Sequence, residues 1–269
     1  YDVWHSTFEH NECWDSETGI FIKGDHPGDN NPQHDVVIRY NYLHNLPVAI
    51  QFGGVGSTTT SNIPPQTSYV YQNLMVDVSF GGVVFIGYDN VTPAKVTVSN
   101  NTFHRVGQTS SNETGAILLR PGYTGYRELV FRNNLVTNGS AGVTSWDSAF
   151  NANTSATTFS HNNYYGNSSP AYIGYRSYSL SSWRSTFGKD TTGTTELNPL
   201  YLGASDFRLA SSSPIRNSGL DILDLNGNGS TTDSVAVGAY VTGNEIMGPV
   251  AGLSTAAPNP PTNVEVVVP

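Results

Sequence analysis

One short pattern of apolar and polar positions recurs along the chain. It consists of an apolar residue, two variable residues, an asparagine, one variable residue and a second apolar residue, as in Ile38, Asn41 and Leu43. A repeat of about 30 residues is typical of solenoid proteins, in which each repeat buries its apolar face only by stacking on its neighbours. The asparagines of the pattern are Asn11, Asn41, Asn73, Asn101, Asn134 and Asn162.

A second short apolar segment follows most of these motifs, as at 48–52 and 115–120. Apolar positions alternate with a period of two, which predicts β-strands, and no segment carries a helical stripe over several turns. The sequence therefore predicts an all-β solenoid. We expect each repeated asparagine to lie at a sharp turn, to tolerate a left-handed backbone, and to hydrogen-bond to the asparagines of the neighbouring coils. A β-sandwich is the alternative, but six asparagine motifs at nearly constant spacing argue against it.

Two repeats read VSNNTFHRV (98–106) and FRNNLVTNG (131–139), and the later segments 197–219 and 235–240 read LNPLYLGASDFRLASSSPIRNSG and VAVGAY. These motifs are similar to coils and closing segments of right-handed parallel β-helix proteins, the pectate-lyase-like superfamily of secreted carbohydrate-active proteins. The resemblance extends over about residues 3–240. It implies a right-handed parallel β-helix, and it is much less specific about the reaction.

The domain organisation that we expect has two parts. Residues 1–245 form the parallel β-helix, with a closing segment at about 190–245. Residues 246–269 form a proline-rich linker that leads into a possible fibronectin type III-like module. Because the chain begins inside a coil, we expect it to be a fragment of a longer, multidomain protein that is secreted or attached to the cell surface.

Composition excludes several classes of protein. The chain has 269 residues, with 12 Lys and Arg against 21 Asp and Glu, so its formal net charge is −9. An acidic chain with scattered cations is a poor candidate for binding nucleic acid. Apolar runs are much shorter than the ~20 residues that span a bilayer, so we expect no membrane insertion. The single cysteine, Cys13, excludes a disulfide framework.

The second strands suggest a surface that binds an acidic polysaccharide. Aligned by their apolar positions, they place two cations and an aromatic ring in one outward column. Cations contact the carboxylates of uronate residues, and aromatic rings stack on sugar rings. The sequence does not indicate an oligomeric state. The column consists of Lys23, Gln51, Gly87, Arg120 and Trp146.

The same column suggests a polysaccharide lyase. In β-elimination a base removes the proton next to a carboxylate that a cation or Ca²⁺ neutralises. The segment GAILLRPG around Arg120 resembles the arginine strand of the chondroitinase-B and alginate-lyase family. We therefore expect Lys23 to act as the base and Arg120 to hold the substrate, with Gln51, Trp146 and Tyr123 as further substrate-binding residues.

Acidic side chains concentrate near the start of the chain. Clustered carboxylates on loops are the oxygen ligands that Ca²⁺ prefers. Four of them flank the strand that carries Lys23, and a lysine beside bound Ca²⁺ would have a lowered pKa. The sequence therefore predicts Ca²⁺ as a cofactor, and a solvated acidic edge is the alternative. The predicted metal ligands are Asp15, Glu17, Asp25 and Asp29.

Two other functions stay open from the sequence. A glycoside hydrolase needs two opposed carboxylates ~5–9.5 Å apart, and Asp25 and Asp89 are the candidate pair. A non-catalytic extracellular solenoid, structural or adhesive, would need no catalytic residues and would also explain the repeated coils.

Overall fold

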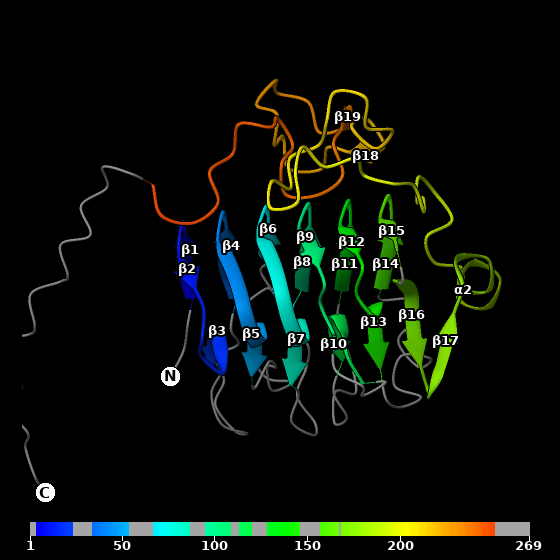
Figure 1. Ribbon diagram of the computed structural model, residues 1–269, viewed down its shortest axis with the longest axis horizontal. Helices are drawn as coiled ribbons and strands as arrows, with labels where there is room; N and C mark the ends of the chain where they lie inside the picture. Colours follow the sequence, from blue (N-terminus) through cyan, green and yellow to red (C-terminus); the bar gives the residue numbers. More distant parts are fainter. Residues whose placement is uncertain are drawn as a thin grey trace, which may run out of the picture.

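The fold is a parallel β-solenoid of coils of about 30 residues. The computed structural model describes residues 4–23, 34–53, 67–86, 95–108, 113–119, 128–145, 157–166 and 168–250. In Figure 1 the coils lie side by side along the long axis of the molecule, with the first coil in blue and the last in green. The all-β solenoid that the asparagine spacing predicts is confirmed.

One strand of each coil belongs to a six-stranded parallel sheet, here called the first sheet. Its inward column is apolar and fully buried in the middle coils, where Ile38, Val70, Val98 and Phe131 follow one another. The strands are, in order along the solenoid, β1 (Trp4–Glu9), β4 (His34–Arg39), β6 (Thr67–Tyr71), β8 (Lys95–Ser99), β11 (Glu128–Arg132) and β14 (Thr157–Ser160).

The rest of each coil belongs to an eleven-stranded sheet, here called the second sheet. The long strands β5 (Tyr42–Gly53) and β7 (Leu74–Ile86) run through a bend that separates two shorter strands in most other coils. The remaining strands are β2 (Glu12–Cys13), β3 (Thr18–Lys23), β9 (Thr102–His104), β10 (Gly115–Leu119), β12 (Leu135–Thr137), β13 (Ala141–Ser145), β15 (Asn163–Tyr165), β16 (Ser169–Ile173) and β17 (Arg176–Tyr178).

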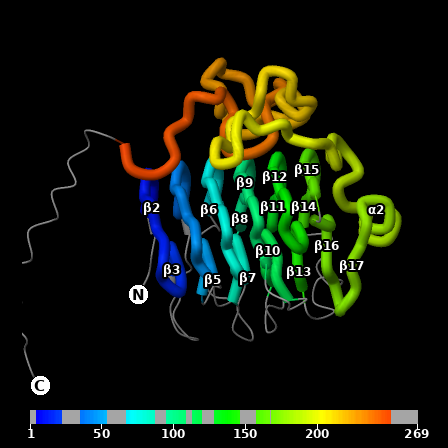
Figure 2. The backbone as a smooth tube through the Cα atoms, viewed as in Figure 1, coloured from blue at the N-terminus to red at the C-terminus, as the bar shows by residue number. Residues whose placement is uncertain are grey.

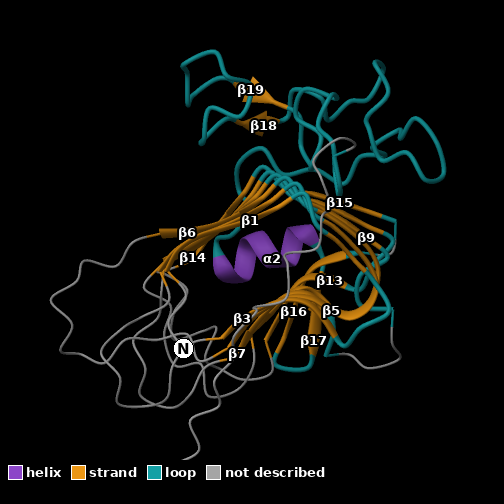
Figure 3. Cartoon of the chain, turned by 90° about the vertical axis from the view of Figure 1, so that its left-hand side faces the viewer, coloured by secondary structure: helices purple, strands orange, loops and turns teal. Residues whose placement is uncertain are grey.

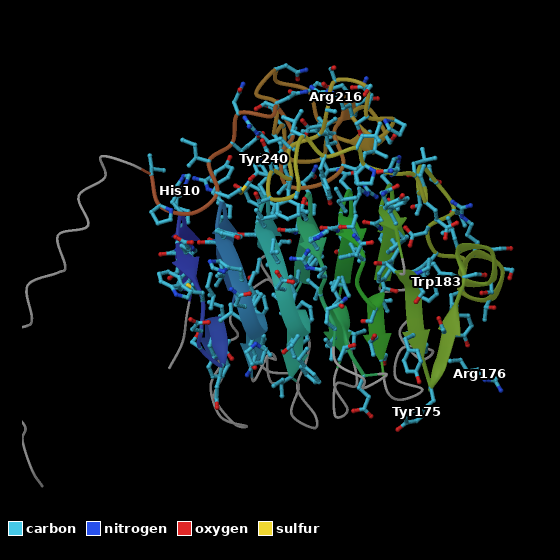
Figure 4. All side chains as sticks on the ribbon, viewed as in Figure 1. His10, Tyr175, Arg176, Trp183, Arg216 and Tyr240 are labelled. Carbon is cyan, nitrogen blue, oxygen red and sulfur yellow. The ribbon has the colours of Figure 1, made fainter. Side chains whose placement is uncertain are left out.

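A short helix closes the end of the core beyond the last coil. Helix α2 (Leu180–Phe187) begins after Ser179, whose hydroxyl accepts a hydrogen bond from the Ser182 amide, and it ends at Gly188 in the left-handed conformation. Its Trp183 is fully buried and meets Phe159 edge to face. Figure 3, viewed from the first coil, shows the helix across the far end of the space between the sheets, and Figure 4 labels Trp183 there.

The repeated asparagines form the predicted ladder. Each side-chain amide donates to the Oδ1 of the next asparagine, at 2.9 Å from Asn11 to Asn41 and at 3.3 Å from Asn134 to Asn162. The ladder ends at Asp190, whose Oδ1 accepts from the Asn162 amide at 2.9 Å. Because the ladder asparagines from Asn41 to Asn162 are buried, each of their bonds also gives a partner to a polar group that would be costly to leave without one.

One detail of the turn differs from the expectation. The left-handed residue is the one before each ladder asparagine, with φ between 50° and 56°. The ladder asparagine itself keeps a negative φ and points its amide inward, so the preceding residue makes the chain reversal. This column of left-handed residues consists of His10, Tyr40, Gln72, Asn100, Asn133 and His161.

The C-terminal part of the described chain lies along the solenoid rather than across an end. We call residues 197–250 the strap. It leaves the last coil and returns to the first, in yellow and then orange in Figures 1 and 2. Its backbone is tied to the turns of several coils: the Asn100 amide donates to the Ala236 carbonyl, and Gly248 N donates to the Tyr40 carbonyl. The predicted closing segment therefore covers one edge of the coils.

Apolar side chains attach the strap to the outer face of the second sheet. Phe207 packs on Leu74 and Val76, and Tyr240, labelled in Figure 4, packs in the same cluster. Two short strands, β18 (Gly219–Leu220) and β19 (Ser234–Val235), pair antiparallel within the strap. Among the described residues no helix has the length and apolar character needed to cross a membrane.

His104 joins the strap to the coils as a neutral imidazole. Its Nε2 accepts from Arg105, so the Nδ1 proton points to the Thr137 hydroxyl at 2.8 Å. The ring also packs between Tyr201 and Phe207 of the strap. Burial, reinforced by the nearby Arg105, lowers the pKa of His104 to about 4.

We expect acid to weaken this attachment. Because the pKa of His104 is lowered on folding, the unfolded chain binds the proton more tightly, and stability is lost as the pH falls from about 6.5 to about 4. The loss is on the order of 3 kcal/mol. Urea unfolding across this range measures it, with His104→Gln as the matched variant, which retains a donor and an acceptor but does not titrate. Equal pH dependence in the two proteins would contradict the prediction.

Candidate functional site

The strand register corrects the predicted column of outward residues. Lys23 pairs with Gly53, and Gly53 pairs with Ile86. Gln51 pairs instead with Phe21 and Val84, two residues away from the position predicted for it. An alignment on alternating apolar residues cannot detect a shift of two, because such a shift leaves the same side chains facing inward. Lys23 and Gln51 therefore do not share a column.

Several predicted residues lie outside the part of the chain that the structure describes. Strand β3 ends at Lys23, but the side chain of that lysine is not among the described ones. Gln51 is half-buried on the outer face of β5. The predicted residues outside the described ranges are Asp25, Asp29, Asp89, Arg120, Tyr123 and Trp146.

Two of the predicted calcium ligands are described. Asp15 and Glu17 are exposed in the turn between β2 and β3, and Asp15 has a left-handed backbone with φ 51°. Within the described ranges, no group of three His, Cys, Asp or Glu side chains has a geometry that could hold a metal ion. The predicted Ca²⁺ site therefore depends on Asp25 and Asp29.

An aromatic stack that we did not predict lies beside this turn. The ring of Trp14 is parallel to that of His44 at 5.9 Å, and His44 stacks on Tyr42 at 4.2 Å. Glu12 fixes the imidazole through a 3.1 Å contact to Nε2. Trp14 is 52% exposed. An exposed indole held in one orientation is a suitable surface for the apolar face of a sugar ring.

The outer face of the first sheet carries a pocket near the last coil, with a cavity volume of about 350 Å³. We call it the basic pocket because its lining includes an arginine, a histidine and a lysine. Alternation along β11 and β14 turns Arg132, Thr158 and Ser160 outward. The left-handed Gly188 ends α2 and starts the loop that forms the other wall. The lining residues used below are Arg132, Thr158, Ser160, His161, Lys189 and Thr192.

The titratable side chains that line the described pocket are all bases. Arg132 Nε donates to the Ser160 hydroxyl at 2.8 Å, and within the described ranges no carboxylate forms an ion pair with this guanidinium. Lys189 Nζ donates to the Thr157 carbonyl. Burial lowers the pKa of both Arg132 and Lys189. The half-buried Arg132 guanidinium, which has no carboxylate counterpart among the described residues, favours the binding of an anion.

His161 adds a polar atom without a partner. Its Nδ1 is buried and makes no hydrogen bond among the described residues. Burial, followed by the charge of Arg132, lowers the pKa of this imidazole, while Asp190 acts in the opposite direction. These surroundings disfavour the protonated form of His161. The negative charge of a bound anion would favour the protonated form.

Sequence reasoning missed the basic pocket because its bases lie far apart along the chain. Arg132 and His161 each belong to a coil motif, but only the coil register brings strands β11 and β14 together. A usable signal was present: Arg132 and Ser160 both stand two residues before a ladder asparagine, so aligned motifs place them in one column. The position of Lys189 depends on the loop after α2, for which the repeat gives no information.

The fold and the site together define a parallel β-solenoid with a basic pocket on its outer surface. Comparison with protein-family models, curated proteins and solved structures finds no match to this chain.

Proposed function

We propose that the protein binds an acidic, uronate-containing polysaccharide on the outside of its solenoid and acts on it as a secreted polysaccharide lyase. The observation that carries the proposal is the basic pocket. In a chain with net charge −9, Arg132, His161 and Lys189 gather at one place where the lining includes no carboxylate. A polymer with regularly spaced negative groups is a ligand that such a pocket would attract.

The exposed aromatic stack supports the carbohydrate part of the proposal. Trp14 and His44 lie on the first two coils, whereas the basic pocket lies near the last coil. A long polymer can engage separate sites on one rod, whereas a small ligand cannot. Binding at several weak sites would raise the overall affinity without any new contact.

The proposed chemistry is β-elimination, with Lys23 as the base. Strand β10, which ends one residue before Arg120, lies three strands from β3 in the second sheet. At ~4.8 Å per strand, the strand ends are ~14 Å apart. Arg120 would therefore hold a different sugar residue from the one on which Lys23 acts. Ca²⁺ held by Asp15, Glu17, Asp25 and Asp29 would neutralise the carboxylate next to the proton that is removed.

An assay for unsaturated products tests the proposal. Pectate, alginate and chondroitin are incubated with the protein, with and without Ca²⁺, and the ultraviolet absorbance of the new double bond is followed. We expect product from one of the polymers and a loss of at least about 100-fold in rate for Lys23→Ala. Lys95→Ala is the matched control, because Lys95 forms a surface ion pair with Glu128 at 2.9 Å. Absence of product from every polymer would remove the lyase proposal.

A non-catalytic extracellular solenoid, structural or adhesive, is the second candidate. The continuous asparagine ladder and the strap that runs along the coils favour it, because both make a stiff rod. Binding of a polymer without any product would support this function. Saturated sugar products would instead support the glycoside hydrolase, with Asp25 and Asp89 as its carboxylates.

A further inference from the structure

Donors approach the basic pocket from three separate elements. Arg132 comes from β11, Thr158 and Ser160 come from β14, and Lys189 and Thr192 come from the loop after α2. A carboxylate has two oxygens in one plane, and a single guanidinium can bind both. Donors on three walls match a tetrahedral group with three terminal oxygens better than they match a planar carboxylate.

We propose that the basic pocket is a subsite for a sulfate ester on the polysaccharide, and that His161 takes up a proton when the ester binds. This inference rests on the proposed function, because the sulfate would be carried by the bound polymer. Arg132 accounts for the permanent charge in the pocket, and its Nε bond to Ser160 holds the guanidinium in position. The hydroxyls of Thr158 and Thr192 are exposed at the walls and can donate to the remaining ester oxygens.

The surroundings of His161 explain why it would gain a proton. The charged groups around the ring are Arg132 from β11, Lys189 from the pocket loop, and the buried Asp190. In the empty pocket Arg132 opposes a second positive charge. A bound sulfate places a negative charge beside Arg132 and the imidazole, and this charge favours the protonated form of the ring.

The ring of His161 is also fixed in place. Gly193 has φ +67°, and a Cβ at this position would lie 2.1 Å from His161 Cδ2. The glycine therefore lets the loop backbone close against the imidazole. Because the ring is already held in place, the histidine loses little side-chain entropy when an anion binds, and this preorganisation favours binding.

Calorimetric titration of the whole protein tests the subsite. The ligands are a sulfated oligosaccharide, its desulfated form, an oligouronate and inorganic sulfate, each at about pH 5.5 and about pH 7.5, on either side of the ordinary histidine pKa. We expect the sulfated oligosaccharide to bind best and more tightly at the lower pH. Heats measured in buffers of different ionisation enthalpy should show proton uptake on binding.

Two variants and one control assign the effect to residues. Arg132→Gln should weaken binding of the sulfated ligand about tenfold or more, and His161→Gln should remove the pH dependence and the proton uptake. Arg208→Gln is the control, because Arg208 is an exposed arginine of the strap paired with Asp206. If His161→Gln fails to fold, the imidazole C–H resonances of the wild-type protein report its titration with and without inorganic sulfate.

The outcomes separate this inference from the proposed function. Equal binding of the oligouronate and the sulfated ligand would overturn the sulfate subsite and leave the proposed function intact. Binding of inorganic sulfate at Arg132 and His161, with no binding of any polymer, would overturn the proposed function and, with it, a polysaccharide sulfate ester as the ligand of the pocket. Tight binding that does not change in Arg132→Gln would place the ligand elsewhere and overturn the inference.

Discussion

Replacement of Asp190 by asparagine is expected to lower the free energy of unfolding by about 3–5 kcal/mol, because it disrupts a fully buried and fully partnered carboxylate. Its oxygens accept from the Asn162 amide, the Thr194 hydroxyl, the Tyr164 hydroxyl and the Trp183 indole. An asparagine amide can replace one oxygen only. Its NH₂ group would then face a side chain that also donates, such as the indole N–H.

Urea unfolding followed by tryptophan fluorescence measures this effect close to the site, because the indole of Trp183 is one of the partners. Asp15→Asn is the matched control: it removes the same charge from an exposed turn, at a left-handed residue where asparagine is well tolerated. Burial raises the pKa of Asp190, so the folded state holds its proton more tightly than the unfolded state. Acid therefore does not weaken the fold through this group. A stability of Asp190→Asn equal to that of wild type would contradict the assignment.

Replacement of Asn101 by alanine is expected to cost about 3–4 kcal/mol. Asn101 is fully buried in the middle of the ladder. Its amide donates to Asn134 Oδ1 at 3.1 Å and to the Val70 carbonyl at 2.9 Å, and its Oδ1 accepts from both nitrogens of Asn73. Alanine would leave these groups buried without their present partners.

Asn11→Ala provides the comparison within the same ladder. Asn11 is exposed on the first coil, so water can replace its bonds, and we expect a loss of well under about 1 kcal/mol. Thermal and urea unfolding of the two variants measure the difference. If both variants lost equal stability, burial of the asparagines would not explain how the ladder contributes to the free energy of unfolding.

The fold could be predicted from the sequence because an asparagine marks each repeat, and this asparagine has the same role in every coil. Asn41 and Asn73 recur in phase, and a turn ladder is the structure that uses such spacing. The register of the second strands could not be predicted to the same precision. Gln51 stands two residues from its predicted place because a strand face repeats every two residues. Arg120 and Trp146 lie outside the described ranges, so their roles stay predictions.

The strap and the basic pocket were harder to predict, for a different reason. Phe207 and Tyr240 pack on the coils from an irregular segment, which has no periodicity to mark its buried side. The basic pocket depends on where the loop with Lys189 returns after α2. Contacts between a repeat and a non-repeating segment are set by the final packing, and no local pattern encodes them.

The asparagine ladder gives the solenoid an electrical direction. Every side-chain amide points its NH₂ group toward the last coil and its oxygen toward the first, so the amide dipoles align as peptide dipoles do in a helix. The positive end of this array meets the Asp190 carboxylate. The two ends of the rod are therefore not equivalent. Removing the last coil would leave the positive end without its counter-charge.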